Sequence, residues 1–274
     1  MSLILTLTST SSRLAVLKYT LLSLLDQKHK ADKIVLCISK SPYLIDEGIK
    51  DLPEWLSYMV SQGEIEINWV ENTGPYRKLI PVYRSADEDD WIVTCDDDVI
   101  YAPEWLESLV KTAQQYPSAI VCGRARRPSK NPLGIRQGYM SWPIVPLGSR
   151  GKHLLPIGIA GVLYRKNLLD KETMYSDEFK KLAPKQDDLW FHLARKLVDG
   201  EVVVCLEAGK HVFPIEAPGA LSVSNTASNL PDWDKFISAL SSRIMIKFKS
   251  YVGIPTCDND VVIKNLGKFK SSLF

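Results

Sequence analysis

Three consecutive aspartates, Asp96, Asp97 and Asp98, follow the apolar run 91–95. Adjacent carboxylates repel one another, and the repulsion is stronger at the end of a buried strand, where the dielectric constant is low. A divalent cation such as Mn²⁺ or Mg²⁺ would offset these charges, because hard cations prefer oxygen ligands. Alternate side chains of an extended strand point to the same side, so Asp96 and Asp98 would face one metal while Asp97 points away. The alternative is a solvated acidic turn before a helix.

A second carboxylate pair, Asp187 and Asp188, precedes an apolar stripe of helical spacing at 189–197. Aspartate is a good helix N-cap and complements the helix dipole, which is the structural interpretation. The functional interpretation is a general base that deprotonates an acceptor hydroxyl. Both interpretations hold together if one aspartate caps the helix and the other reaches the site.

Three further residues have both a functional and a structural interpretation. Lys78 could bind a phosphate as a point charge, or it could be an ordinary exposed lysine. His211 follows the apolar run 201–206 and is either a metal ligand or a structural histidine. Gly161, in "PIGIAGVLYR", would let a ligand approach the backbone closely, or would simply serve a turn.

The elements that must position these residues alternate along the chain. Most of the apolar runs are continuous, as in strands that are buried on both faces, whereas 64–70 alternates and indicates an edge strand. The expected strands are 3–8, 33–39, 64–70, 91–95, 119–123, 161–165 and 201–206. Apolar residues at helical spacing lie between several of them, at 14–24, 105–113 and 189–197. This order predicts an α/β fold with a mostly parallel sheet flanked by helices.

In an open parallel sheet, ligands bind beyond the carboxyl ends of the strands. The polar segments 8–13, 71–78 and 96–98 all follow predicted strands, so we expect them to converge on one crevice. The segment 124–157 breaks the alternation and is predicted to be a long loop, of a length that is usually functional or disordered.

Composition excludes several classes of protein. The 274 residues carry a formal net charge of +2, which does not indicate a nucleic-acid partner. The chain has no apolar run long enough for a membrane-spanning helix and no secretory leader pattern. The five cysteines, an odd number without a C-x-x-C pair, indicate reduced thiols and a cytoplasmic protein.

The sequence resembles the GT-A glycosyltransferases, and among them the family-2-like bacterial enzymes of polysaccharide synthesis. Five segments in order carry the resemblance: "LTSTSSR" with "SLLDQKHKADKIVLCIS", "GPYRKLIPVYR", "WIVTCDDDVIYAPEWLESLV", "GIAGVLYR" and "LAPKQDDLWFHLARK". The resemblance implies a Rossmann-like GT-A domain at 1–220, which binds the nucleotide sugar and holds the catalytic site. We expect 221–274 to form a C-terminal helical extension packed on that domain.

The resemblance also implies a role for each candidate residue. The donor would be a nucleotide sugar, and a UDP-sugar first of all; the acceptor would be a glycan or a lipid-linked saccharide. Asp98 and Asp96 would hold Mn²⁺ or Mg²⁺, and Asp188 or Asp187 would be the catalytic base. The expected nucleotide-sugar-binding residues are Thr8, Ser9, Arg13, Lys78, Asp96, Asp97 and Gly161.

Alternatives stay open at this stage. A base that activates the acceptor gives inversion at the anomeric carbon, whereas retaining enzymes of this fold often use a late histidine as a metal ligand, which is the role left for His211. A phosphatase of the haloacid dehalogenase type would also place an Asp-x-Asp motif after a strand, with Asp96 as the nucleophile. A non-catalytic binding module would need no second carboxylate pair.

The last 44 residues are rich in Lys and Arg, and Ile237, Leu240, Ile244 and Phe248 indicate a basic amphipathic helix among them. Such a helix would contact an anionic membrane, and the enzyme would then work at the inner face of the cell membrane. The alternative is a helix packed on the core with a solvated basic face.

Overall fold

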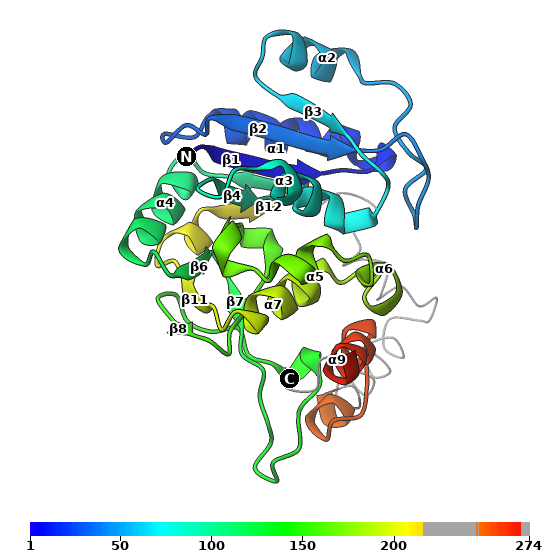
Figure 1. The fold of residues 1–274 in the computed structure, drawn as a ribbon, viewed down its shortest axis with the longest axis vertical. Helices are drawn as coiled ribbons and strands as arrows, with labels where there is room; N and C mark the ends of the chain where they lie inside the picture. Colours follow the sequence, from blue (N-terminus) through cyan, green and yellow to red (C-terminus); the bar gives the residue numbers. More distant parts are fainter. Residues whose placement is uncertain (216–244, 246, 270–274) are drawn as a thin grey trace, which may run out of the picture.

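A central sheet organises the computed structural model, which describes residues 1–215, 245 and 247–269 (Figure 1). Within these residues, eight strands pair in the order β3-β2-β1-β4-β10-β6-β11-β8. The strands are β1 Leu3–Thr8, β2 Lys33–Ile38, β3 Glu66–Trp69, β4 Trp91–Thr94, β6 Ala119–Cys122, β8 Arg150–Gly151, β10 Val162–Arg165 and β11 Glu201–Val204.

Most of the neighbouring strands run parallel, so the predicted α/β fold is confirmed. β3, β2, β1 and β4 form a parallel block, and β6 and β11 form a second parallel pair. β10 runs antiparallel between these blocks and joins β4 to β6. β3 lies at the edge, as its alternating sequence predicted.

Helices cover both faces of the sheet (Figure 1). One apolar cluster joins Leu5 and Leu7 of β1 to α1, α2 and α4, whereas Ile4 belongs to a cluster on the other face with α3, α5, α6, α7 and α9. Strands buried on both faces need apolar residues at every position, which explains the continuous runs in the sequence. The helices are α1 Leu14–Leu25, α2 Glu54–Ser61, α3 Ile80–Ser85, α4 Trp105–Gln115, α5 Lys171–Tyr175, α6 Phe179–Leu182, α7 Asp187–Leu197 and α9 Asp258–Phe269.

The segment 124–157 is mostly irregular, as predicted, but it contains short elements that the sequence did not indicate. β7 (Ala125–Arg126) pairs with β9 (Leu155–Pro156) in a small antiparallel sheet, and β8 joins the edge of the main sheet. Another small sheet pairs β5 (Val99–Tyr101) with β12 (Val212–Pro214). Of these, the β7–β9 pairing joins the two ends of the loop.

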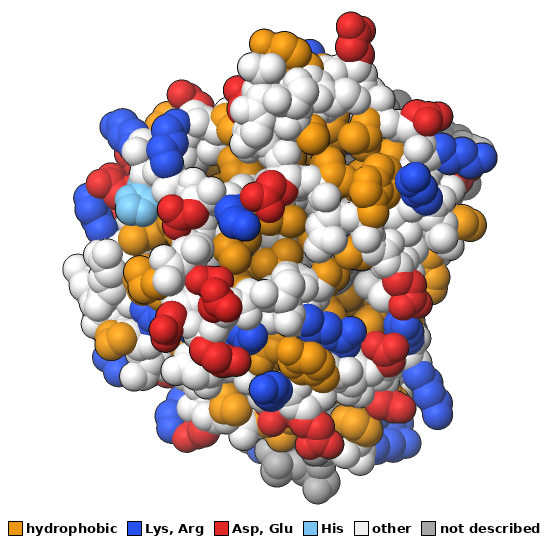
Figure 2. Space-filling view, turned by 45° about the horizontal axis from the view of Figure 1, so that its top comes forward, with side chains coloured by type: hydrophobic (Ala, Val, Ile, Leu, Met, Phe, Trp, Pro, Cys, Tyr) orange, Lys and Arg blue, Asp and Glu red, His pale blue; other side chains and the backbone are white. Residues whose placement is uncertain are grey.

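The C-terminal part of the chain is described only in part. α9 packs on the α7 side of the sheet, where Val262, Ile263 and Leu266 are buried in the core. The predicted amphipathic helix at 237–248 lies largely outside the described residues. Among those residues, no helix is long and apolar enough to cross a membrane. Acidic and basic side chains are interspersed on the face shown in Figure 2.

Candidate active site

Side chains from several strand ends line one pocket with a volume of about 440 Å³. β1 and β4 are parallel neighbours, so the residues that follow them leave the sheet at the same edge. The short 3₁₀ helix η2 (Gly74–Lys78) is tied to β1 because the Thr6 hydroxyl donates to the Lys78 carbonyl at 2.8 Å. Of the predicted site residues, the lining includes Thr8, Ser9, Arg13, Lys78, Asp96, Asp97 and Asp98.

The three aspartates form a turn between β4 and β5, and they differ in exposure. Asp96 and Asp98 are partly exposed to the pocket, whereas Asp97 is buried. The Ser9 hydroxyl donates to Asp97, and Arg13 Nη1 lies 3.2 Å from Asp97 Oδ1. Burial raises the pKa of Asp97 to about 6, while Arg13 and Ser9 oppose that rise. Arg13 also pairs with Asp98 through its other terminal nitrogen, so it bridges two of the three carboxylates.

Lys78 connects the aspartate turn to α7. Its Nζ lies 3.1 Å from Asp96 Oδ1 and 2.9 Å from Asp187 Oδ2, and the residue is only 7 % exposed. Burial by itself lowers the pKa of Lys78, but the charges of Asp187 and Asp96 outweigh burial and raise the pKa well above its ordinary value. Lys78 is therefore a fixed cation, and Asp187 serves mainly as its counterion.

Asp188 has a different environment from its neighbour. Its Oδ2 accepts a hydrogen bond of 3.2 Å from the Gly158 amide, and its Oδ1 lies on the same side of Gly158 as Lys78 Nζ. Lys78 lines the pocket, whereas Asp188 lies behind it and is not part of the lining. Burial, followed by the charge of Asp187, raises the pKa of Asp188 to about 7. A carboxylate that titrates near neutral pH is suited to accept a proton from a hydroxyl group.

The two glycines of the segment 158–161 face different neighbours. A Cβ atom on Gly158 would lie 3.0 Å from Lys78 Nζ and 3.2 Å from Asp188 Oδ1, so Gly158 borders the charged groups of the site. Gly161 has φ of +80°, and a Cβ there would lie 2.2 Å from Cζ2 of Trp105. Gly161 therefore packs on the core side chain of Trp105, and the glycine beside the site is Gly158.

This difference predicts two distinct mutant phenotypes. Gly161→Ala is expected to lower the free energy of unfolding by roughly 2–4 kcal/mol, because it combines a clash with the buried ring of Trp105 with a strained φ. Gly158→Ala should cost less stability, since the flexible end of Lys78 can shift, but it should slow catalysis by displacing Lys78 or Asp188. Urea unfolding and rate measurements on both variants test this. Equal stability of Gly161→Ala and the wild type would contradict it.

His211 lies away from the aspartates. In the β5–β12 pairing the Ile215 amide donates to the Asp98 carbonyl, whereas the His211 carbonyl accepts from Ala102 at the other end of the pair. Four residues of extended chain separate His211 from Ile215, or roughly 13 Å. The charged groups near His211 are Glu104 and Glu207. His211 and Asp98 therefore lie at opposite ends of the antiparallel β5–β12 pair, too far apart to bind the same metal ion.

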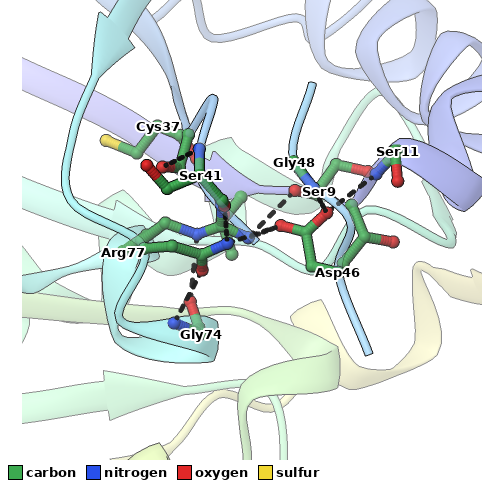
Figure 3. Close-up of polar contacts among 12 residues, drawn as sticks. Ser9, Ser11, Cys37, Ser41, Asp46, Gly48, Gly74 and Arg77 are labelled. Carbon is green, nitrogen blue, oxygen red and sulfur yellow. Dashed lines mark hydrogen bonds and ion pairs between the residues drawn. The ribbon is translucent and has the colours of Figure 1, made fainter. Parts of the chain in front are cut away.

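A buried ion pair that sequence reasoning missed also lines the pocket (Figure 3). Arg77 Nη2 donates to Asp46 Oδ2 at 3.0 Å and to the Ser9 carbonyl at 3.1 Å. Asp46 also accepts from the amides of Ser11 and Gly48. No sequence signal singles out Asp46, which has Glu47 beside it and Asp51 nearby in the irregular segment after β2 and lies 31 residues from its partner.

This ion pair holds the segment 43–46 against the strand ends. Tyr43, Leu44 and Ile45 line the pocket there and face the polar wall made by the aspartate turn. Pro75 adds another apolar surface, and Lys185, just before α7, adds an exposed cation. The pocket thus offers apolar surface at one end and charge at the other.

The carboxylates of Asp96 and Asp98 suit a hard divalent cation, and their side chains are 29 % and 30 % exposed. Among the described residues, no group of three or more His, Cys, Asp or Glu side chains could enclose a metal. Mg²⁺-type sites often need only one or two carboxylates when substrate phosphates supply the other ligands. The donor set therefore fits a metal that binds together with a diphosphate, and does not fit a preformed protein cage.

Comparison with known proteins gives a family and a fold. A family model described as Glycosyl transferase family 2 matches residues 7–173, more than half of the chain. No curated protein sequence matches the chain. The architecture resembles crystal structures of S. aureus TarS 1-349, with a TM-score of 0.54 and 15 % identity over 100 % of this chain and 81 % of that one.

Two further structures of TarS 1-349 are complexes. The complex with UDP-GlcNAc has a TM-score of 0.52 and 12 % identity and covers 100 % of this chain and 82 % of that one. The complex with UDP has a TM-score of 0.52 and 13 % identity, with coverages of 97 % and 80 %. Identity this low is evidence for the fold alone, and the shared fold confirms the predicted GT-A architecture.

Proposed function

This chain belongs to glycosyl transferase family 2 and is a glycosyltransferase, and we propose that it moves a sugar from a nucleotide diphosphate donor to a hydroxyl group of a glycan or lipid-linked acceptor. One observation carries the proposal. Lys78 contacts both the aspartate turn and Asp187, and Asp187 is the neighbour of Asp188, whose pKa is raised to about 7. Groups suited to donor binding and to proton abstraction therefore lie side by side.

The pocket has the chemistry to bind a nucleotide diphosphate. A nucleobase would lie against the apolar wall of Tyr43, Leu44 and Ile45, which the Asp46–Arg77 pair holds in place. The diphosphate would lie toward the cations Arg13 and Lys185. Uridine is the proposed nucleoside, because the structurally similar TarS 1-349 was crystallised with UDP-GlcNAc and with UDP.

A divalent metal, Mn²⁺ or Mg²⁺, would be held by Asp98 with help from Asp96, and when bound it would offset the negative charge of the diphosphate. Arg13 pairs with Asp98, and Lys78 pairs with Asp96. Arg13 would then be free to turn toward the phosphates once Asp98 has another cationic partner.

We propose that Asp188 is the catalytic base. It accepts the proton of the acceptor hydroxyl, whose oxygen then forms a bond to the anomeric carbon as the bond from that carbon to the nucleotide diphosphate breaks. A single in-line displacement of this kind inverts the anomeric configuration. The position of His211 far from Asp98 removes the observation that favoured the retaining alternative.

The other predictions about function differ in their support. The haloacid dehalogenase alternative is wrong, because the chain belongs to a glycosyltransferase family. A role in polysaccharide synthesis and a cytoplasmic setting stay proposals; the five free cysteines of the described residues are compatible with a reducing compartment. The division into a catalytic domain at 1–220 and an extension at 221–274 also stays a proposal; of the extension, the structure describes residues 245 and 247–269.

A thermal-shift screen of nucleotide sugars, with and without Mn²⁺, tests the donor and the metal together. A UDP-sugar at about 100 times its dissociation constant should stabilise the protein by roughly 2.7 kcal/mol, and other nucleotide sugars by less. Asp98→Ala should lose the Mn²⁺-dependent part of this stabilisation, whereas the exposed control Asp89→Ala should keep it. If no nucleotide sugar stabilises the wild type, the proposed donor class is wrong.

A further inference from the structure

The segment 124–157 has a charge pattern unlike the rest of the chain. It contains no Asp or Glu, although the whole protein has nearly equal numbers of acidic and basic residues. Its seven basic residues are Arg124, Arg126, Arg127, Lys130, Arg136, Arg150 and Lys152. A positive field of this kind favours an anionic partner. The proposed function uses none of these side chains.

The central part of this segment is an ordered hairpin that displays apolar side chains at its tip. The Gln137 amide donates to the Ser129 carbonyl, and the Asn131 amide donates to the Ile135 carbonyl. Gly134, with φ of +75°, closes the turn, and Asn131 Oδ1 accepts from the amides of Leu133 and Ile135. Leu133 is 83 % exposed and Ile135 is 42 % exposed. The hydrogen bonds of this turn thus hold Leu133 in a solvent-exposed position.

A second segment, 247–254, lies beside the hairpin. Asn131 Nδ2 donates to the Tyr251 carbonyl at 3.2 Å, and the Gly138 amide donates to the Ser250 carbonyl at 2.7 Å. This segment also has no acidic residue, and its large side chains Tyr251 and Ile254 are exposed. We call the combined surface the hairpin surface: Lys130, Leu133, Ile135, Arg136, Tyr251 and Ile254.

The hairpin surface projects from the body of the molecule. In Figure 1 the loop extends well beyond the neighbouring elements, at the end of the molecule opposite α2. Lys130 and Arg136 face each other across the hairpin, one residue on each side of the Asn131–Ile135 turn. Apolar side chains at a tip, with cations just behind them, match the order of layers in a lipid monolayer: acyl chains inside and anionic headgroups outside.

We propose that the hairpin surface docks this enzyme on an anionic membrane, with Leu133 and Ile135 inserted among the lipids and Lys130 and Arg136 against the headgroups. The charge pattern favours lipid over a second copy of the chain, because two copies would bring like charges together. An aromatic side chain such as Tyr251 also prefers the headgroup level. The contact is peripheral and adds to whatever the C-terminal residues contribute.

The hairpin is joined to the catalytic site at its base. The Ile157 amide donates to the Arg124 carbonyl, and the next residue, Gly158, donates to Asp188. In a membrane-docked enzyme the segment that contacts the lipid would therefore be linked through Gly158 to the proposed base on α7, which suits an acceptor carried by a lipid anchor. This last step rests on the proposed function, whereas membrane docking does not.

Co-sedimentation of the full chain with vesicles tests the docking without any measurement of sugar transfer. We expect binding to phosphatidylcholine vesicles that contain about 30 % phosphatidylglycerol, weaker binding to pure phosphatidylcholine, and weaker binding in about 0.5 M salt. The double variant Leu133→Ser with Ile135→Ser, and the double variant Lys130→Gln with Arg136→Gln, should each bind roughly tenfold less. The control Tyr58→Ser removes a side chain that is 64 % exposed on α2, and should bind like the wild type.

Two results would overturn the proposal. One is the absence of wild-type binding to the anionic vesicles; the other is equal binding by the wild type and both double variants. Sedimentation velocity without lipid tests whether a second copy of the chain occupies the surface instead. The surface would be assigned to a second copy if the wild type forms a dimer, only the Leu133 and Ile135 variant loses it, and the wild type does not bind vesicles. Unchanged UDP-sugar stabilisation in the variants would separate a docking defect from a damaged fold.

Discussion

Asp188→Asn is expected to lower the rate of sugar transfer by a factor of about 10²–10⁴ while donor binding stays unchanged. The asparagine can still accept the hydrogen bond from Gly158, so the local structure should persist, but it cannot take a proton from the acceptor. Transfer is measured by release of the nucleotide diphosphate in the presence of acceptor, and donor binding by thermal shift. An Asp188→Asn enzyme with full activity would move the base elsewhere.

The pH dependence gives an independent readout of the same residue. Since the pKa of Asp188 is raised to about 7, its basic form is lost as the pH falls below 7, and the wild-type kcat/KM should fall with it. The Asp188→Asn variant should lack this fall in kcat/KM on the acidic limb of the pH profile. The stability of the fold depends on pH in the opposite way to the activity. The Asp188 carboxyl holds its proton more tightly in the folded than in the unfolded protein, so its contribution to the free energy of unfolding rises as the pH falls from about 7 toward 4.

Asp187→Asn is the matched control for this assignment. Asp187 pairs with Lys78 at 2.9 Å and is only 8 % exposed, so its loss should disturb the position of Lys78 and reduce the rate by less than the loss of the base. The variant should keep the acidic limb of the pH profile. If Asp187→Asn is the variant that loses this limb, the roles of the two residues are exchanged.

Lys78→Met is expected to have the largest effect on the fold, with a loss of about 3–5 kcal/mol in the free energy of unfolding near neutral pH. The change leaves Asp96, Asp187 and Asp188 close together without the cation that raises the stability of their charged forms. Protonation relieves that repulsion, so the loss should be smaller at about pH 5.5 than at about pH 8. Urea unfolding at both pH values measures the difference.

The control for Lys78 is Lys185→Met, which removes an exposed lysine from the same pocket. It should leave the unfolding free energy nearly unchanged and weaken donor binding moderately, because surface charges contribute little to stability. A Lys78→Met protein as stable as Lys185→Met at both pH values would mean that Lys78 is not the central cation of the site.

Several parts of the fold could be predicted from sequence because burial dictates residue type. The run 3–8 is apolar at four of its six positions, on both faces of the strand, since Ile4 faces one helical layer while Leu5 and Leu7 face the other. The position of β10 could not be predicted in this way. Its sequence fits a parallel or an antiparallel strand equally well, and only its partners β4 and β6 determine its direction.

The site shows the same division. The triple aspartate is visible in the sequence because like charges next to a buried strand are rare without a cationic partner. The Asp46–Arg77 pair was missed because its members are 31 residues apart in the sequence and meet only in the folded chain. Arg13 was expected at the nucleotide site, but its pairing with Asp97 and Asp98 depends on how α1 begins beside the turn.

The α/β architecture, the edge of the sheet at which the candidate site forms and the two groups of candidate carboxylates could be predicted from the residues alone. Which aspartate of the second pair is suited to be the base depends on contacts that exist only in the folded chain. Consecutive residues of a helix point about 100° apart, so Asp187 turns to the buried Lys78 and is neutralised, while Asp188 turns to Gly158. Burial without an equally close cation is what raises the pKa of Asp188 toward neutrality, and no local sequence pattern encodes that.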